Sequence, residues 1–116
     1  MVDDEEYMVE ILRGLLESLG YDVASTTSSL KALELFKSNP DRFDLVITDM
    51  AMPRMDGKDL SKKFIEIRQS ILIILCTGFS ETMDERKARD MGIKEFVMKP
   101  IVKAELAKVV RRVLDN

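Results

Sequence analysis

The amino-acid sequence predicts an α/β fold in which helices cover both faces of a parallel sheet. Segments in which apolar residues recur at helical spacing alternate along the chain with short apolar runs, and this order is typical of parallel strands joined by crossover helices. The runs Leu45 to Thr48 and Ile71 to Cys76 are almost continuously apolar, as expected for strands covered on both faces. Sheets of this kind gather their functional residues at the carboxyl ends of the strands.

The first predicted elements are a strand stub, a helix and a short strand. Met1 and Val2 form the stub, and a helix is expected from about Glu5 to Leu19, with Gly20 as its stop signal. The apolar residues of this helix recur at helical spacing, and they are Met8, Ile11, Leu12, Leu15, Leu16 and Leu19. Tyr21 to Ser25 is expected to form the next strand.

A second helix and a second apolar strand are expected in the middle of the chain. Ser28 or Ser29 can cap the helix, and Pro40 marks its end because proline disfavours helical backbone at the residue before it. The apolar positions of this helix are Leu30, Leu33 and Phe36. The strand over Leu45 to Thr48 then stops at Asp49.

Two more helices follow, on either side of the most apolar run. Asp56 and Gly57 have the character of a turn and cap residue pair, ahead of a helix whose apolar positions are Leu60, Phe64 and Ile67. The strand Ile71 to Cys76 comes next, and Thr82 with Glu85 forms a capping box for a fourth helix.

The last elements are a short strand and an amphipathic helix. The fourth helix has few large apolar residues, chiefly Met83 and Met91, so weak anchoring is expected. Glu95 to Met98 forms a strand closed by Lys99 and Pro100. One stripe of the final helix is apolar, and it consists of Leu106, Val109, Val110, Val113 and Leu114.

Composition limits the chemistry of the chain. It has 116 residues, the size of one ordinary domain, and a net charge of −3, which argues against a nucleic-acid footprint. Without histidine, the chain has no Ser/His or Cys/His pair and no histidine-ligated metal. Its single cysteine, Cys76, excludes an internal disulfide and fits a reducing, cytoplasmic setting. No apolar run approaches the roughly 20 residues of a membrane span, so no membrane contact is expected.

Polar residues follow the predicted strands directly. Asp3 and Asp4 follow the stub, Asp49 follows the Leu45 strand, Thr77 follows the Ile71 strand and Lys99 follows the Glu95 strand. Three carboxylates at one rim would repel each other unless a hard cation such as Mg²⁺ lay among them. A lysine and a hydroxyl beside that cation would suit a phosphoryl group, and a carboxylate can form an acyl phosphate with it.

Together these motifs resemble the receiver domain of bacterial response regulators. The segments are Asp3-Asp4, Asp44 to Gly57, Cys76-Thr77-Gly78 and Phe96 to Pro100. The resemblance covers nearly the whole chain, residues 1–116, as a single domain. It implies a flavodoxin-like fold with a five-stranded parallel sheet in the order 2-1-3-4-5.

The resemblance also implies a function and a set of site residues. Asp49 would accept a phosphoryl group from the phosphohistidine of a histidine kinase or histidine phosphotransfer domain. Mg²⁺ or Mn²⁺ would be bound by Asp3, Asp4, Asp49 and the backbone carbonyl of Ala51. Thr77 and Lys99 would bind the phosphoryl oxygens, and the peptide bond before Pro100 would be cis. The domain itself would then be a phosphoacceptor with self-catalysed phosphotransfer and dephosphorylation rather than an enzyme.

The same resemblance implies a conformational switch. Thr77 would be paired with an aromatic residue, here Phe96, whose ring turns inward on phosphorylation. Because phenylalanine has no phenol hydroxyl, the coupling would be steric. The stretch Leu75 to Glu81, together with Met91 to Ile93 and Phe96 to Ile101, resembles more specifically the receivers at the C-terminal end of hybrid sensor histidine kinases, a pattern that stand-alone receivers can share. The sequence leaves open the kinase partner, the output and whether the chain forms homodimers.

One feature departs from the receiver pattern. The family's first strand has several apolar residues before its acidic pair, whereas here only Met1 and Val2 precede Asp3. That strand is central in the expected sheet, so strands two and three would lack a partner between them. We therefore expect the natural chain to extend upstream.

Three alternative functions are weighed against this interpretation. A haloacid-dehalogenase-like aspartyl-phosphate phosphatase needs a second Asp two residues after the nucleophile, where this chain has Ala51. A flavin- or nucleotide-binding domain would have a glycine-rich loop where Asp3 and Asp4 stand. A degenerate receiver used only for protein contact is disfavoured because Asp4, Asp49, Thr77 and Lys99 are all present.

Overall fold

The computed structural model describes residues 1–78 and 85–115. Its elements in chain order are α1 (Glu6–Ser18), α2 (Ser29–Ser38), the 3-10 turn η1 (Pro40–Arg42), β1 (Leu45–Asp49), α3 (Gly57–Ile67), β2 (Leu72–Thr77), α4 (Glu85–Met91), β3 (Glu95–Met98) and α5 (Lys103–Asp115). Thr82 and Met83, which were assigned to the start of the fourth helix, lie outside the described residues.

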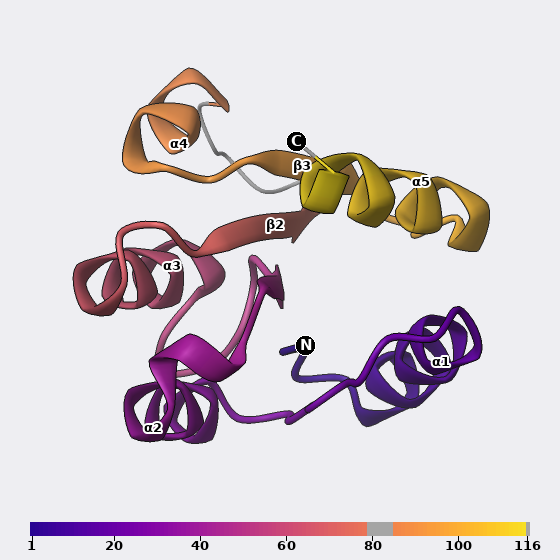
Figure 1. Cartoon of the computed structure of the whole chain (residues 1–116), viewed down its shortest axis with the longest axis horizontal. Helices are drawn as coiled ribbons and strands as arrows, with labels where there is room; N and C mark the ends of the chain where they lie inside the picture. The colour runs from indigo at the N-terminus through magenta and orange to yellow at the C-terminus, as the bar shows by residue number, and fades with distance from the viewer. Residues whose placement is uncertain (79–84, 116) are drawn as a thin grey trace.

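Helices cover both faces of a central sheet, as the sequence predicts (Figure 1). One apolar cluster joins the sheet to α1 and α5, and its buried members are Leu12, Leu16, Ile47, Ile74, Cys76, Val97, Leu106, Val109, Val110 and Val113. A second cluster joins the other face to α2 and α3, with buried members that include Ala32, Leu33, Phe36, Leu60, Phe64, Ile73, Leu75 and Ala88. The side chains of consecutive strand residues therefore pack into opposite clusters, which explains why the strands are apolar throughout.

The sheet is parallel, and its regular part has the order β1-β2-β3. In the register, Asp49 is the partner of Cys76, and Thr77 is the partner of Met98. Val2 adds single parallel bridges to Thr48 on one side and to Thr26 on the other. Across the sheet the order is therefore Thr26, Val2, β1, β2, β3, which is the predicted order 2-1-3-4-5.

The first two expected strands are reduced to these bridges. The amide of Val2 donates to the carbonyl of Ile47 at 2.8 Å, and the amide of Thr26 donates to the carbonyl of Met1 at 3.1 Å. Tyr21 to Ser25, predicted as a strand, has no regular strand pairing. The segment beside it, Met1-Val2, offers only two residues for pairing, and the hydrogen bonds of Met1 reach only Ala24 and Thr26.

Side-chain caps place the helices close to their predicted bounds. Ser28 is the N-cap of α2 and accepts a hydrogen bond from the amide of Lys31. Asp56 is the N-cap of α3 and accepts one from the amide of Asp59, so its predicted role as a cap is confirmed. Gly20, with a φ of 95°, follows the end of α1 in a conformation that favours glycine.

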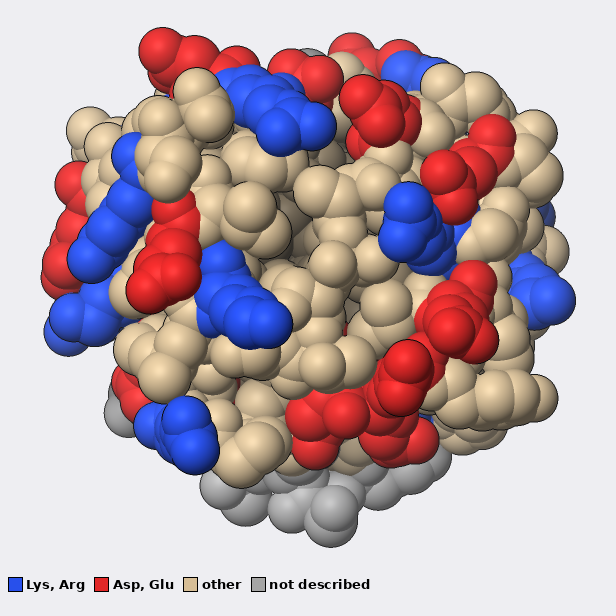
Figure 2. All heavy atoms as spheres, turned by 90° about the horizontal axis from the view of Figure 1, so that it is seen from below, with Lys and Arg blue, Asp and Glu red and all other residues tan. Residues whose placement is uncertain are grey.

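Charged side chains of both signs are mixed on the surface. On the face in Figure 2, Lys and Arg are interspersed with Asp and Glu around uncharged surface, and no continuous basic patch forms there. Within residues 1–78 and 85–115, no helix is long and apolar enough to cross a membrane.

Candidate functional site

Asp49 is held in place by the backbone on both sides of β1. It is the last residue of β1 and is only 1% exposed. Its amide donates to the carbonyl of Val2 at 2.8 Å, and the next amide, that of Met50, donates to the carbonyl of Cys76 at 2.8 Å. The central position of β1 therefore fixes the direction in which the Asp49 side chain leaves the sheet.

Three carboxylates meet at this edge of the sheet. Asp3, Asp4 and Asp49 each contribute an oxygen to a group whose atoms all lie within 4.8 Å of one another. Asp3 is buried and Asp4 is exposed, so the cluster opens to solvent on one side. One oxygen of Asp3 also accepts a hydrogen bond from the amide of Glu5 at 2.9 Å, which orients that carboxylate at the start of α1.

Lys99 brings a positive charge to the same place. Its Nζ lies 2.6 Å from Oδ1 of Asp49 and forms an ion pair with it. Apart from this ion pair, Oδ1 has no hydrogen-bond partner among the described residues. The Lys99 amide donates to the carbonyl of Thr77 at 2.8 Å. The Lys99–Pro100 peptide bond is cis, which is the geometry that the resemblance implies.

Without a further cation, burial and mutual repulsion destabilise the charged forms of these carboxylates. Burial raises the pKa of Asp49 to about 6, and the contact with Lys99 only partly opposes this, while Asp3 and Asp4 add to it. Burial likewise raises the pKa of Asp3, against the hydrogen bond from Glu5. For Lys99, burial lowers the pKa, but the contact with Asp49 and its charge outweigh burial and raise it. One lysine therefore does not neutralise the cluster.

The donor set fits a small, hard divalent cation. Mg²⁺ binds oxygen ligands at 2.0–2.1 Å, so neighbouring ligands lie roughly 3 to 4 Å apart. Carboxylate oxygens within 4.8 Å of one another need only small side-chain movements to reach that spacing. The exposed side of the cluster, at Asp4, leaves room for the waters that Mg²⁺ retains.

The other predicted site residues lie nearby in the sheet or in its loops. Thr77 is buried at the end of β2, and its hydroxyl donates to the carbonyl of Gly78 at 3.2 Å. Ala51 is exposed in the loop after β1, and a role for its carbonyl stays a prediction. Phe96 is half-buried in β3, where the guanidinium carbon of Arg89 lies 6.0 Å from the ring centre.

Gly57 is a site residue whose role the sequence did not reveal. A Cβ at this position would lie 2.2 Å from the carbonyl oxygen of Asp49 and 2.8 Å from a methyl carbon of Leu75. The Gly57 amide donates to the carbonyl of Met50 at 2.7 Å, which brings the start of α3 against the end of β1. The sequence signal was Asp56-Gly57, which we interpreted only as a turn and cap.

Comparison with known families agrees with this geometry. The sequence model of the response regulator receiver domain matches residues 1–111. The chain therefore belongs to the response regulator receiver domain family.

Individual relatives are similar over nearly the whole chain. Two-component response regulator ARR12 of Arabidopsis thaliana is 33% identical over 115 residues, which cover 99% of this chain and 19% of the relative. Hybrid signal transduction histidine kinase L of Dictyostelium discoideum is 31% identical, with 100% of this chain and 7% of the relative covered. The chain thus spans less than a fifth of the length of these two relatives.

Solved structures show the same fold. The receiver domain protein from Clostridium thermocellum superposes with a TM-score of 0.92 at 29% identity, over 98% of this chain and 90% of that structure. A CheY-like receiver domain protein from Methanospirillum hungatei gives a TM-score of 0.88 at 25% identity, over 98% of this chain and 90% of that structure. The predicted flavodoxin-like fold of the receiver class is therefore confirmed.

Proposed function

We propose that Asp49 accepts a phosphoryl group from a phosphohistidine on a partner histidine kinase or histidine phosphotransfer domain. The observation that carries the proposal is the convergence of three carboxylates and Lys99 at the carboxyl edge of the sheet, with Lys99 Nζ 2.6 Å from Asp49. Because the sequence contains no histidine, the donor must be supplied by another domain or protein. The one unpaired cysteine is consistent with a reducing, cytoplasmic setting.

In the proposed transfer, a carboxylate oxygen of Asp49 forms a bond to phosphorus as the nitrogen–phosphorus bond of the phosphohistidine breaks. The imidazole leaves with the electron pair and takes up a proton from solvent. Lys99 moves from its ion pair with Asp49 to an oxygen of the transferred group, because formation of the acyl phosphate removes the charge from that carboxylate. Thr77 reorients its hydroxyl from Gly78 to a second phosphoryl oxygen.

Asp3, Asp4 and Asp49 would hold Mg²⁺ or Mn²⁺ in this state, together with the carbonyl of Ala51. A divalent cation at that place supplies positive charge to the phosphoryl oxygens as they approach the carboxylates. Asp3 is the residue whose orientation is already set, by the amide of Glu5. We further propose that the occupied site changes the packing of Phe96 and thereby the surface near α4.

The proposal is tested by incubating the chain with Mg²⁺ and acetyl phosphate and measuring the intact mass. We expect one phosphoryl adduct that is stable in acid and labile in base. It should be absent from Asp49→Asn and present in Asp44→Asn, a matched control because Asp44 is an exposed carboxylate immediately before the same strand. An adduct of unchanged yield in Asp49→Asn would refute the assignment.

The principal alternative is a degenerate receiver that acts only through protein contact. It predicts no adduct in the wild-type chain with either acetyl phosphate or a phosphorylated kinase. A haloacid-dehalogenase-like phosphatase would instead hydrolyse phosphomonoesters. This class is disfavoured because Ala51 stands where it needs a second Asp.

A further inference from the structure

Two buried hydroxyl groups next to the site have no part in the proposed transfer. Thr48 and Ser61 both have an exposed fraction of 0%. The Thr48 hydroxyl donates to the carbonyl of Asp49 at 3.1 Å, and the Ser61 hydroxyl donates to the carbonyl of Gly57 at 2.7 Å. Buried hydroxyls generally have a partner, but the Ser61 bond stays inside α3, whereas the Thr48 bond reaches the proposed phosphoacceptor.

The Thr48 hydroxyl fixes one end of the peptide group between Asp49 and Met50. The other end is the N–H of Met50, which donates to the carbonyl of Cys76 at 2.8 Å. Gly57 closes off a further side of the Asp49 carbonyl, because a Cβ on Gly57 would lie 2.2 Å from that oxygen. The plane of this peptide group is therefore set by a hydrogen bond at each end and by the approach of α3.

The next peptide group, between Met50 and Ala51, is held by α3. Its carbonyl, that of Met50, accepts a hydrogen bond from the amide of Gly57 at 2.7 Å. These three hydrogen bonds together fix the backbone that leads from Asp49 to Ala51, whose carbonyl is a proposed metal ligand. Of the three, the one from Thr48 is donated by a side chain, so it is the one that a substitution can remove.

We propose that Thr48 is a positioning residue for the divalent cation, because its hydroxyl sets the direction of the backbone between Asp49 and Ala51. This inference rests on the proposed function, in which both residues supply ligands. Without the hydroxyl, the peptide group after Asp49 can tilt and carry the Ala51 carbonyl with it. Mg²⁺ tolerates such a movement poorly, because it requires near-octahedral geometry at about 2.0–2.1 Å. Loss of a group that orients a metal ligand typically weakens binding by about 10–100-fold, and Thr48 acts one peptide group further away, so the low end of this range is expected.

The test isolates the hydroxyl in two pairs of chains with side chains of nearly equal size. One pair is the wild type and Thr48→Val, and the other is Thr48→Ser and Thr48→Ala. In each pair we expect the chain without the hydroxyl to bind Mg²⁺ about three- to tenfold more weakly, in a titration followed by the amide NMR signals of Met50 and Ala51. Ser61→Ala is the matched control. It removes an equally buried hydroxyl whose bond lies within α3, and it should keep the Mg²⁺ affinity within about twofold of the wild type.

Equal Mg²⁺ affinities within the pairs would overturn the proposal, and so would an equal loss of affinity in Ser61→Ala, which would indicate a general loosening of the packing. If Thr48→Val does not fold, the comparison of Thr48→Ser with Thr48→Ala decides. The titration does not depend on phosphorylation. A wild type that shows the expected Mg²⁺ affinities but gains no adduct from acetyl phosphate would refute the phosphoacceptor role and leave this inference standing. A wild type in which Mg²⁺ leaves the signals of Met50 and Ala51 unchanged would refute the metal site and this inference together.

Discussion

Gly57 occupies a position where the start of α3 passes against the end of β1. Because a Cβ there would come within 2.2 Å of the Asp49 carbonyl oxygen, Gly57→Ala must displace the backbone of either α3 or Asp49. We expect the free energy of unfolding to fall by about 2 kcal/mol or more, as measured by urea denaturation, and phosphorylation by acetyl phosphate to slow.

Gly14→Ala is the matched control for this substitution. Gly14 lies in α1, and a Cβ there meets no atom within 4 Å. Alanine should therefore stabilise the helix by about 0.5–1 kcal/mol. The steric account of Gly57 would be wrong if both substitutions changed the stability in the same direction.

The charge of Asp49 has a measurable effect on stability when no divalent cation is present. Its pKa is raised to about 6 by burial, so between about pH 4 and pH 6 the folded chain retains a proton that the unfolded chain has released. The stability of the wild type should therefore fall, relative to Asp49→Asn, as pH rises through this window. Lys99 stays charged throughout, because its pKa is raised by Asp49.

Urea denaturation of both proteins in metal-free buffer at several pH values measures this effect. The two free energies of unfolding should be similar near pH 4, diverge in favour of Asp49→Asn up to about pH 6, and then stay parallel. A difference that is constant with pH, or one that favours the wild type increasingly, would show that burial does not dominate the pKa of Asp49.

At the scale of elements, Arg68 ties the end of α3 to the turn before β1. Its guanidinium donates to the carbonyl of Pro40 at 3.0 Å and also to that of Phe43. Arg68→Met keeps much of the side chain's apolar stem but leaves both carbonyls without this donor. We expect a loss of about 1–2 kcal/mol in urea denaturation.

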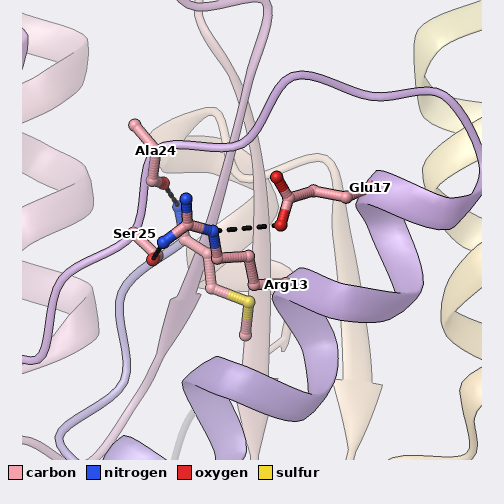
Figure 3. Close-up of polar contacts among 5 residues, drawn as sticks. Arg13, Glu17, Ala24 and Ser25 are labelled. Carbon is pink, nitrogen blue, oxygen red and sulfur yellow. Dashed lines mark hydrogen bonds and ion pairs between the residues drawn. The ribbon is translucent and has the colours of Figure 1, made fainter.

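Arg13 is the control for Arg68, because it too bridges two segments but on the surface. It donates to Glu17 at 3.1 Å and to Ser25 at 3.4 Å (Figure 3), and its side chain is 48% exposed. Arg13→Met should change the stability by less than about 0.5 kcal/mol. Equal losses of stability from the two substitutions would mean that water replaces Arg68 as the hydrogen-bond donor to these two carbonyls.

The elements also show what a sequence can and cannot predict. Leu45 to Thr48 and Ile71 to Cys76 were found because strands covered on both faces need apolar residues throughout. Tyr21 to Ser25 has the composition of a strand but lacks regular strand pairing, because pairing depends on a neighbour that is distant in the sequence. Helix ends were predicted closely where a local cap sets them, as Ser28 and Asp56 do.

For the molecule as a whole, the location of the site was predictable and its close packing was not. Sequence reasoning placed the carboxylates of Asp3, Asp4 and Asp49 together with Lys99, because parallel strands all end at one edge of the sheet, and the structure brings these four side chains together. The approach of Gly57 to Asp49 depends on how α3 packs against β1, which no local pattern encodes.

Binding of a divalent cation by the acidic cluster, as we propose, would be coupled to the stability of the whole fold. A ligand that binds only the folded state adds RT ln(1 + [L]/Kd) to the free energy of unfolding, which is about 1.4 kcal/mol when its concentration is ten times Kd. For a domain of this size we expect Mg²⁺ at such a concentration to raise the melting temperature by about 5 °C over that in EDTA. The gain in melting temperature should increase from pH 5 to pH 7, because protons compete for Asp3 and Asp49, whose pKa values are raised by burial.

Two substitutions test whether the cation lies in this cluster. Asp3→Asn should lose most of the gain in melting temperature while keeping an acceptor for the amide of Glu5, and Asp44→Asn should keep the gain. A shift of the same size in Asp3→Asn and the wild type would place the cation elsewhere on the molecule.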